Sequence, residues 1–308
     1  MTVGGLNQVG AAWFLNGVSN LQNQLTQVQR ELSSGYKVQD ASDAPAQTPE
    51  LVNLAASLAS TQTYQTTLTR VRAEAQTADQ TLGSAISLVQ SAQTLASEGA
   101  SSTVSAATRQ SLAQQVQGIQ QQIVSLANTT VEGRYIFGGD QDQSPPYRFD
   151  ASSLAGATGL TNAAATRVIT NPQGETVYQA LTAQQIFAPA DGAGNPVDGN
   201  TFSALQHLVT ALNANDTAEI VSAAASLSTA SGFLNQQQAW YGNAEQRISS
   251  EQDLASTKVT VVQTQIGAIR DTDVTEAATE LTQLATDQSA AYSAEAAIPK
   301  KSLFDYLG

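Results

Sequence analysis

The sequence predicts a mostly α protein: a long helical rod with terminal coiled-coil helices and a central helical bundle, plus a small β-rich inserted domain. Three observations predict this class. Apolar residues recur every three and four positions near both ends of the chain, a spacing that places them on one stripe of a helix. Proline, the strongest helix breaker, is absent from residues 50–144 and 197–298. Turn residues and short β-prone runs gather between about 138 and 201.

The chain begins with a predicted coiled-coil helix. Its apolar stripe consists of Val18, Leu21, Leu25, Val28 and Leu32. Residues 33–49 follow and contain two prolines, so the helix ends within this segment. We expect Gly35 to cap the first helix and Ser42 and Asp43 to cap the next one. The segment is therefore predicted to be a structured spacer.

Two long helical arms are predicted on either side of the centre. The stripe of the first arm is interrupted around Gly99–Thr103 and consists of Leu51, Leu54, Leu58, Leu68, Ala75, Leu82, Ile86, Val89, Leu112, Val116, Ile119, Ile123, Leu126 and Thr130. The second arm runs through Val259, Val262, Ile266 and Ile269 toward a carboxy-terminal heptad pattern of Val274, Ala277, Leu281, Leu284, Gln288, Ala291, Glu295 and Ile298. The heptad patterns at the two ends can pair with each other or with copies of the molecule.

Between the arms we expect a small group of strands. The β-prone runs are Tyr147–Phe149, Arg167–Thr170 and Thr176–Tyr178. Residues 171–174, Asn-Pro-Gln-Gly, separate the last two runs and are typical of a hairpin connection. Gly138-Gly139 is predicted to form the tight exit from the first arm into this region.

An insertion flanked by helices brings the two ends of the chain together. The sequence thus predicts three parts. They are a terminal coiled-coil domain of residues 1–45 with 256–308, a helical bundle of 46–140 with 202–255, and a β-rich outer insertion of 141–201.

The composition argues against a nucleic-acid partner, disulfide bonds, a membrane span and a secretory signal. The formal net charge of −13 argues against nucleic acid, which requires clustered Lys and Arg. Cysteine is absent, so disulfides and Cys-ligated metals are excluded. No run approaches the roughly 20 apolar residues of a membrane span. The first basic residue is Arg30, so the start of the chain does not resemble a secretory signal.

No residue pattern indicates catalysis, a cofactor or a metal. His207 is the only histidine and is expected on the surface or in helix packing. Residues 191–200 lack the terminal glutamate of an EF-hand and are expected to form a polar turn. Asp271 and Asp273 lie two apart, on different sides of a helix if helical, and are expected to be solvated. An enzyme is therefore the least favoured class.

Residues 30–46 read RELSSGYKVQDASDAPA. They are similar to the amino-terminal signature of flagellins and their relatives, the axial proteins of the bacterial flagellum, in which Arg-Leu-Ser-Ser-Gly precedes a Ser/Ala-Asp-rich spacer. This chain departs from that pattern at Glu31 and Pro45. Gly133–Gln141, GRYIFGGDQ, resembles a motif that ends the first bundle arm in the third hook-associated protein family. Ser302–Leu307, SLFDYL, resembles the carboxy terminus of that family.

The resemblance implies an inner layer of terminal helices, a bundle outside it and a variable β-rich domain outermost. It also implies a structural subunit that joins the flagellar hook to the filament, in a ring or helical assembly of copies. The implied partners are the first hook-associated protein, flagellin, the flagellar type III export apparatus and an export chaperone. The implied location is extracellular, on the flagellum, after export without signal cleavage.

For assembly we expect the terminal apolar residues to form the interface. They are Val18, Leu21, Leu25, Val28, Leu32, Leu281, Leu284, Ile298, Leu303, Phe304, Tyr306 and Leu307. The alternative is that the heptads face only the core of their own chain. Trp13 and Phe14 either anchor a partner or pack at the helix start. Two other functions stay open, a divergent flagellin and a secreted helical effector.

Overall fold

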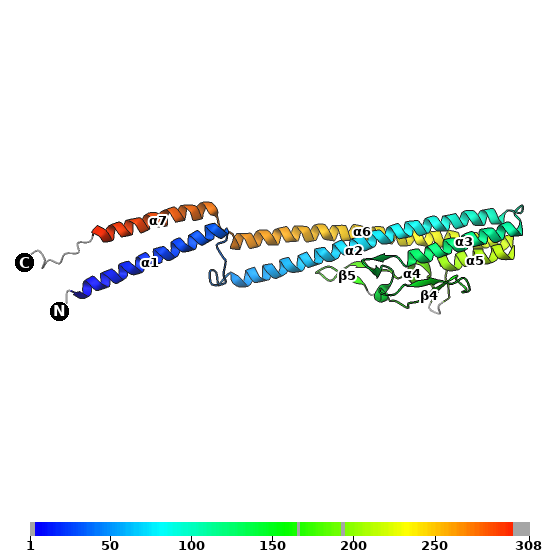
Figure 1. Ribbon diagram of the computed structural model, residues 1–308, viewed down its shortest axis with the longest axis horizontal. Coiled ribbons are helices and arrows are strands. Elements are labelled where there is room, and N and C mark those ends of the chain that lie inside the picture. Colours follow the sequence, from blue (N-terminus) through cyan, green and yellow to red (C-terminus); the bar gives the residue numbers. More distant parts are fainter. Residues whose placement is uncertain (1–3, 165–166, 192–194, 298–308) are drawn as a thin grey trace, which may run out of the picture. The chain divides into compact units, whose positions relative to one another are not determined.

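The computed structural model describes residues 4–164, 167–191 and 195–297. The mostly α class with a small β-rich part is confirmed (Figure 1). The described elements are α1 (Gly4–Ser34), α2 (Thr48–Ala100), α3 (Ala106–Ala127), β1 (Thr130–Val131), β2 (Arg134–Tyr135), a 3-10 helix η1 (Gly139–Gln141), β3 (Tyr147–Phe149), β4 (Ala157–Gly159), β5 (Val168–Thr170), β6 (Thr176–Gln179), α4 (Ala183–Phe187), α5 (Thr201–Ala214), α6 (Thr217–Arg270) and α7 (Val274–Ala297).

The chain separates into two compact units, Met1–Gln62 with Thr257–Gly308 and Thr63–Ser256. Both α2 and α6 contribute residues to each unit. The β-rich region lies within the second unit. The three-part division of the chain stays a prediction.

In the first unit α1 and α7 lie side by side (Figure 1). Val28 and Leu284 are 4% and 8% exposed and form a buried cluster with Ala277. The half-buried residues packed against this cluster are Leu21, Leu25, Leu32 and Leu281. The two heptad patterns therefore pair with each other within one chain, and we call this contact the terminal seam.

The spacer after α1 comprises residues 35–47 and lies within the predicted segment 33–49. The helix α2 begins at Thr48, and the carboxylate of Asp43 accepts the amide hydrogens of Gln39 and Asp40 at 3.0 and 2.9 Å. Asp43 therefore closes a turn within the spacer. The prediction that Ser42 and Asp43 cap α2 is wrong, because the chain makes one more turn before the helix starts.

The other helix ends of this unit have local causes. Gly35 has φ +76° and its amide donates to the carbonyl of Glu31 at 2.8 Å, so it caps α1 as predicted. Asp271 and Asp273 lie between α6 and α7 rather than on a helix face. The carboxylate of Asp273 accepts the amide hydrogen of Thr275 at 2.8 Å and caps α7. The second arm and the carboxy-terminal heptad pattern therefore form two separate helices, α6 and α7.

The second unit is a bundle of α2, α3, α5 and α6 around one apolar core. The predicted stripe of the first arm is buried at Leu68, Ala75, Leu82, Ile86, Val89, Leu112, Val116, Ile119 and Ile123. Thr130 is an exception, because α3 ends at Ala127 and Thr130 is exposed in β1. Ser105 caps α3 through its side chain, which ends the predicted break between the two helices.

A buried arginine joins the helix ends at the α2–α3 turn. Arg109 is 5% exposed. Its guanidinium donates to the carbonyls of Gly99 at 2.7 Å and Ser101 at 2.8 Å, and to the side chain of Asn215. Asn215 is the left-handed C-cap of α5, with φ 58°. The cation therefore lies at the carboxyl ends of α2 and α5, where helix dipoles favour positive charge.

The β-rich region consists of three antiparallel two-stranded pairs, β1–β2, β3–β4 and β5–β6. The predicted hairpin at 171–174 is confirmed: β5 pairs with β6, and Gly174 takes φ +88° in the turn. The strands β1, β2 and β4 were not predicted, because runs of two or three residues carry no periodicity.

The β-rich region shares its core with the bundle. Aromatic rings from both parts are in mutual contact and include Phe137, Tyr147, Tyr178, Phe187, Phe202, Trp240 and Tyr241. A buried ion pair adds to this contact, with Arg167 Nη2 2.7 Å from Glu74 Oε2 on α2. Arg167 also lies 3.4 Å from Asp142 Oδ2. These seven aromatic rings thus hold the β-rich region against the helices.

Candidate assembly interface

All but one of the predicted assembly residues that the structure describes belong to the terminal seam or pack against it, and the exception is Val18. Val28 and Leu284 are buried, and those that are half-buried are Val18, Leu21, Leu25, Leu32 and Leu281. The remaining predicted residues lie outside the described residues and are Ile298, Leu303, Phe304, Tyr306 and Leu307. Val274, the first residue of the heptad pattern, is 59% exposed and does not join the seam.

Large apolar side chains on other faces of these helices remain exposed. Trp13 is 76% exposed and Leu15 is 63% exposed on α1. Tyr292 on α7 is 46% exposed, although its hydroxyl accepts the side-chain amide hydrogen of Gln22 on α1 at 3.1 Å. The simpler expectation for Trp13, that it packs at the helix start, is therefore wrong, whereas Phe14 is half-buried. A seam of two helices buries only one stripe of each, so most of the surface of Trp13 and Leu15 stays exposed in the described part of the first unit.

The helix α7 has a shallow groove beside the seam, about 540 Å³ in volume. Its lining residues are Thr275, Ala278, Thr279, Thr282, Gln283 and Thr286. The hydroxyls of Thr279, Thr282 and Thr286 donate to carbonyls four residues earlier in the helix, at 2.8, 2.9 and 2.9 Å. Because these hydroxyls already have a hydrogen-bond partner, apolar groups can cover the groove without leaving a buried hydroxyl unsatisfied.

Charge is distributed unevenly between the paired helices. No charged residue precedes Arg30, so nearly all of α1 is neutral. The helix α7 has no basic residue and carries the acidic residues Glu276, Glu280, Asp287 and Glu295. A neutral helix surface can be buried against a neighbour without the cost of desolvating ions. The absence of charge from residues 1–29 is a sequence signal for an interface that periodicity alone did not reveal.

A second set of contacts fixes where the seam begins, and sequence reasoning missed it. The amide of Lys37 donates to the carbonyl of Arg270 at 2.8 Å, and the amide of Thr272 donates to the carbonyl of Gly35 at 2.9 Å. The guanidinium of Arg270 lies 4.0 Å from the centre of the Tyr36 ring, a cation–π distance. These contacts hold the end of α1 at the α6–α7 break and so set the register of the seam. No local pattern joins residues so far apart in the chain.

The groups considered for chemistry have structural roles. His207 Nε2 lies 2.8 Å from Glu219 Oε2 across α5 and α6. The carboxylate of Asp191 accepts the amide hydrogen of Asn195 at 2.8 Å, as expected for a polar turn. Asp271 lies 3.2 Å from the guanidinium of Arg270. Within the described ranges, no group of three or more His, Cys, Asp or Glu side chains is placed to hold a metal ion.

A hydropathy search of the described helices identifies none that is long and apolar enough to cross a membrane.

Family models match the two helical arms. The bacterial flagellin N-terminal helical region matches residues 7–142, and the bacterial flagellin C-terminal helical region matches residues 208–307. Together they cover most of the chain and leave the β-rich region largely outside.

Individual proteins and solved structures are also similar. The chain is 26% identical over 220 residues to flagellar hook-associated protein 3 of Escherichia coli (strain K12), which covers 69% of this chain and 68% of that protein. A putative flagellar hook-associated protein from Vibrio parahaemolyticus has a TM-score of 0.63 at 18% identity, covering 74% of this chain and 100% of that one. Flagellar hook-associated protein 3 from Legionella pneumophila has a TM-score of 0.59 at 13% identity, covering 70% and 98%.

The two solved structures share the fold, and the family models match both helical arms in the order found here. The motifs at residues 30–46 and 133–141 lie within the matched amino-terminal region. The chain therefore belongs to the flagellin-like structural proteins of the bacterial flagellum.

Proposed function

We propose that this chain is the structural subunit that joins the flagellar hook to the filament, and that it assembles with copies of itself through its terminal helices. The observation that carries the assembly step is the neutral helix α1, which presents the exposed Trp13 and Leu15 beside the seam. The similarity to hook-associated protein 3 of Escherichia coli supports the place in the flagellum.

The energetics favour assembly over a solitary chain. Covering a large exposed apolar side chain stabilises by about 1.5–3 kcal/mol, and ordering the helices offsets part of this gain. Gln- and Thr-rich helices are marginal alone in water, so the ends of the chain are expected to fray before incorporation. Contacts between unlike surfaces of identical copies repeat into rings or helical arrays.

The remaining partners follow from the same role. Copies of the chain would contact the first hook-associated protein on one side and flagellin on the other. The chain would leave the cell through the flagellar type III export apparatus, with an export chaperone and without signal cleavage, and act outside the cell. The predicted terminal residues Leu303, Phe304, Tyr306 and Leu307 would complete the interface.

Immunogold labelling of intact flagella tests the place of the chain, with an antibody against residues 141–204. Gold confined to one band between hook and filament is the expected result. Label along the whole filament would instead make the chain a flagellin, and flagella without label would favour a secreted effector.

Truncation tests the mechanism. Removing residues 1–29 should abolish incorporation into flagella while the second unit keeps its fold, which circular dichroism of the purified variant would report. Normal incorporation of the shortened chain would overturn assembly through the terminal helices.

A further inference from the structure

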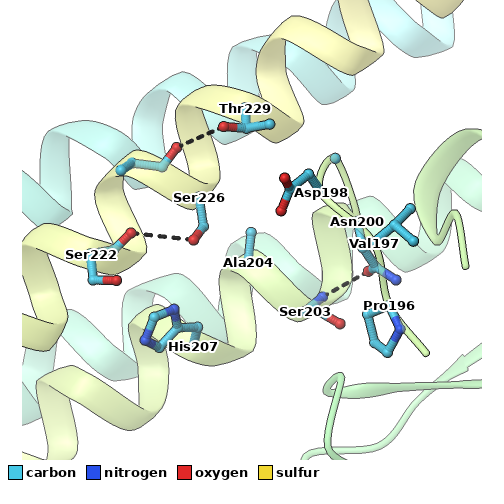
Figure 2. Close-up of a pocket in the computed structure, with 12 residues that line it drawn as sticks. Pro196, Val197, Asp198, Asn200, Ser203, Ala204, His207, Ser222, Ser226 and Thr229 are labelled. Atoms are coloured by element: carbon cyan, nitrogen blue, oxygen red, sulfur yellow. Dashed lines mark hydrogen bonds between the residues drawn. The ribbon is translucent and has the colours of Figure 1, made fainter. Parts of the chain in front are cut away.

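A groove in the second unit lies far from the terminal seam in sequence. It has a volume of about 470 Å³ and lies between α5, α6 and the turn at 196–200. Figure 2 shows Ser203, Ala204 and His207 of α5 opposite Ser222, Ser226 and Thr229 of α6, with Asp198 on the turn. The volume is in the range of binding pockets.

The residues that line the groove include one carboxylate, and most of the others have small side chains. Asp198 lines it, Glu219 pairs with the lining residue His207, and no Lys or Arg is among its lining residues. The hydroxyls of Ser226 and Thr229 donate to carbonyls of their own helix, at 3.2 and 3.3 Å. Val197, at the edge of the groove, is 39% exposed. This chemistry suits a partner that offers one positive charge beside a compact apolar group.

The same chain carries such a surface on the β3–β4 hairpin. Leu154, in the loop of the hairpin, is 100% exposed, and Leu160 just after β4 is 47% exposed. Arg148 lies in β3, opposite Thr158 of β4, and is also exposed. We call Arg148, Leu154 and Leu160 the hairpin surface.

The loop that carries Leu154 is held in one conformation. The carboxylate of Asp150 accepts hydrogen bonds from the amide of Ser152 at 3.0 Å and from the hydroxyls of Ser152 and Thr158 at 2.5 and 3.2 Å. The hydrogen bonds from Ser152 lower the pKa of Asp150 below its ordinary value. A preorganised loop loses little entropy when its exposed leucine is covered.

A copy cannot fill its own groove with its own hairpin. The side-chain amide of Gln120 on α3 donates to the carbonyl of Ala155 at 3.0 Å and to Gln206 of α5 at 3.4 Å. A Cβ at Gly156 would lie 1.9 Å from the Gln120 side chain, so the loop rests directly on α3. Gln206 therefore lies on the side of α5 that faces the hairpin. The next residue, His207, lies on another side of α5 and lines the groove.

We propose that the hairpin surface of one copy docks into the α5–α6 groove of a neighbouring copy, with Leu154 in the groove and Arg148 facing Asp198. This proposal rests on the proposed function, because an assembled subunit has a neighbour at a fixed position. The contact joins unlike surfaces and so propagates from copy to copy. With this contact, the β-rich region would take part in the assembly instead of lying outside the subunit contacts.

The absence of cysteine from the chain makes a disulfide test specific. Flagella carrying the double variant Leu154→Cys/Ser222→Cys would be oxidised and run on a non-reducing gel. The expected result is a covalent ladder of this chain, absent from each single variant. The matched control is Leu154→Cys/Leu254→Cys, since Leu254 is 63% exposed on α6 but does not line the groove. No ladder in flagella that contain the chain, or an equal ladder with the control, would overturn the docking.

Charge reversal supplies a second readout. Arg148→Glu or Asp198→Arg in the double-cysteine background should each reduce the ladder, and combining them should restore it. A cross-link to a different protein would overturn docking between copies. The same variants are also oxidised as concentrated purified protein. A ladder in the purified protein, with the chain missing from flagella, would reject the junction role but keep the docking. No ladder in either sample would reject both the junction role and the docking.

Discussion

The terminal seam leads to a quantitative prediction for Leu284→Ala. Leu284 is 8% exposed and lies in the cluster with Val28 and Ala277. Removing a buried leucine side chain costs about 2–5 kcal/mol. The neighbours Leu25 and Leu281 are only half-buried, so the seam can partly close around the gap. We therefore expect the lower end, about 2 kcal/mol, or roughly a 30-fold increase in the opening of the seam.

Hydrogen exchange followed by mass spectrometry measures this opening directly. Amides of α1 and α7 should exchange about 30-fold faster in the variant, while amides of α3 and α5 in the second unit keep their rates. Val52→Ala is the control, because Val52 is 61% exposed on α2 in the same unit. Unchanged protection of α1 and α7 would refute the reasoning, as would an equal loss of protection in α5.

Three further predictions concern charged groups. Arg109→Met removes the cation that donates to two backbone carbonyls at the end of α2. Charged hydrogen bonds contribute about 1.5–3 kcal/mol each, and the variant regains part of this because the ion is no longer buried. Urea unfolding should therefore show a net loss of about 2 kcal/mol in stability, and an unchanged midpoint would contradict this prediction. Burial raises the pKa of Glu74 above its ordinary value of 4.5, and the Arg167 charge offsets only part of this effect. A raised folded-state pKa gives stability that is present below the unfolded pKa and lost as pH rises through the folded one. The native chain should therefore lose stability relative to Glu74→Gln as pH rises from below 4.5 through the raised pKa of Glu74, whereas parallel pH curves would reject the assignment. Tyr36→Leu removes the ring beside Arg270 and should cost about 0.5–1 kcal/mol, measured by thermal unfolding, while Tyr36→Phe should retain native stability.

Local signals predicted the features that depend on neighbours in the chain. The three- and four-residue spacing of Leu68 through Val89 predicted a buried helix face, and that face is buried. Gly35 ends α1 because a left-handed residue is needed there, which glycine adopts without strain. The Asn-Pro-Gln-Gly run joins β5 and β6 for a similar reason. In each case the physical cause acts within a few residues.

Predictions failed where a residue had a choice of nearby partners or where a distant part of the chain decided the outcome. Asp43 was expected to cap α2, but it binds amides of its own spacer. Asp273 was expected on a solvated face, but it caps α7 because the chain breaks at its contact with Tyr36. Of the two alternatives for Trp13, anchoring a partner or packing at the helix start, the 76% exposure of its side chain contradicts the second, because the seam with α7 lies on a different stripe of α1.

Local patterns in the chain were enough to predict the helical arms, the stripes of the terminal seam, the turn chemistry and the family. The folded structure was needed to show which stripe meets which, and that the β-rich region shares the core of the bundle through its aromatic rings and the Arg167–Glu74 pair. It also placed Arg109 at the carboxyl ends of α2 and α5, and Arg270 over Tyr36. The physical reason is that periodicity and capping are local, whereas burial, ion pairing and ring contacts depend on residues brought together from distant parts of the chain.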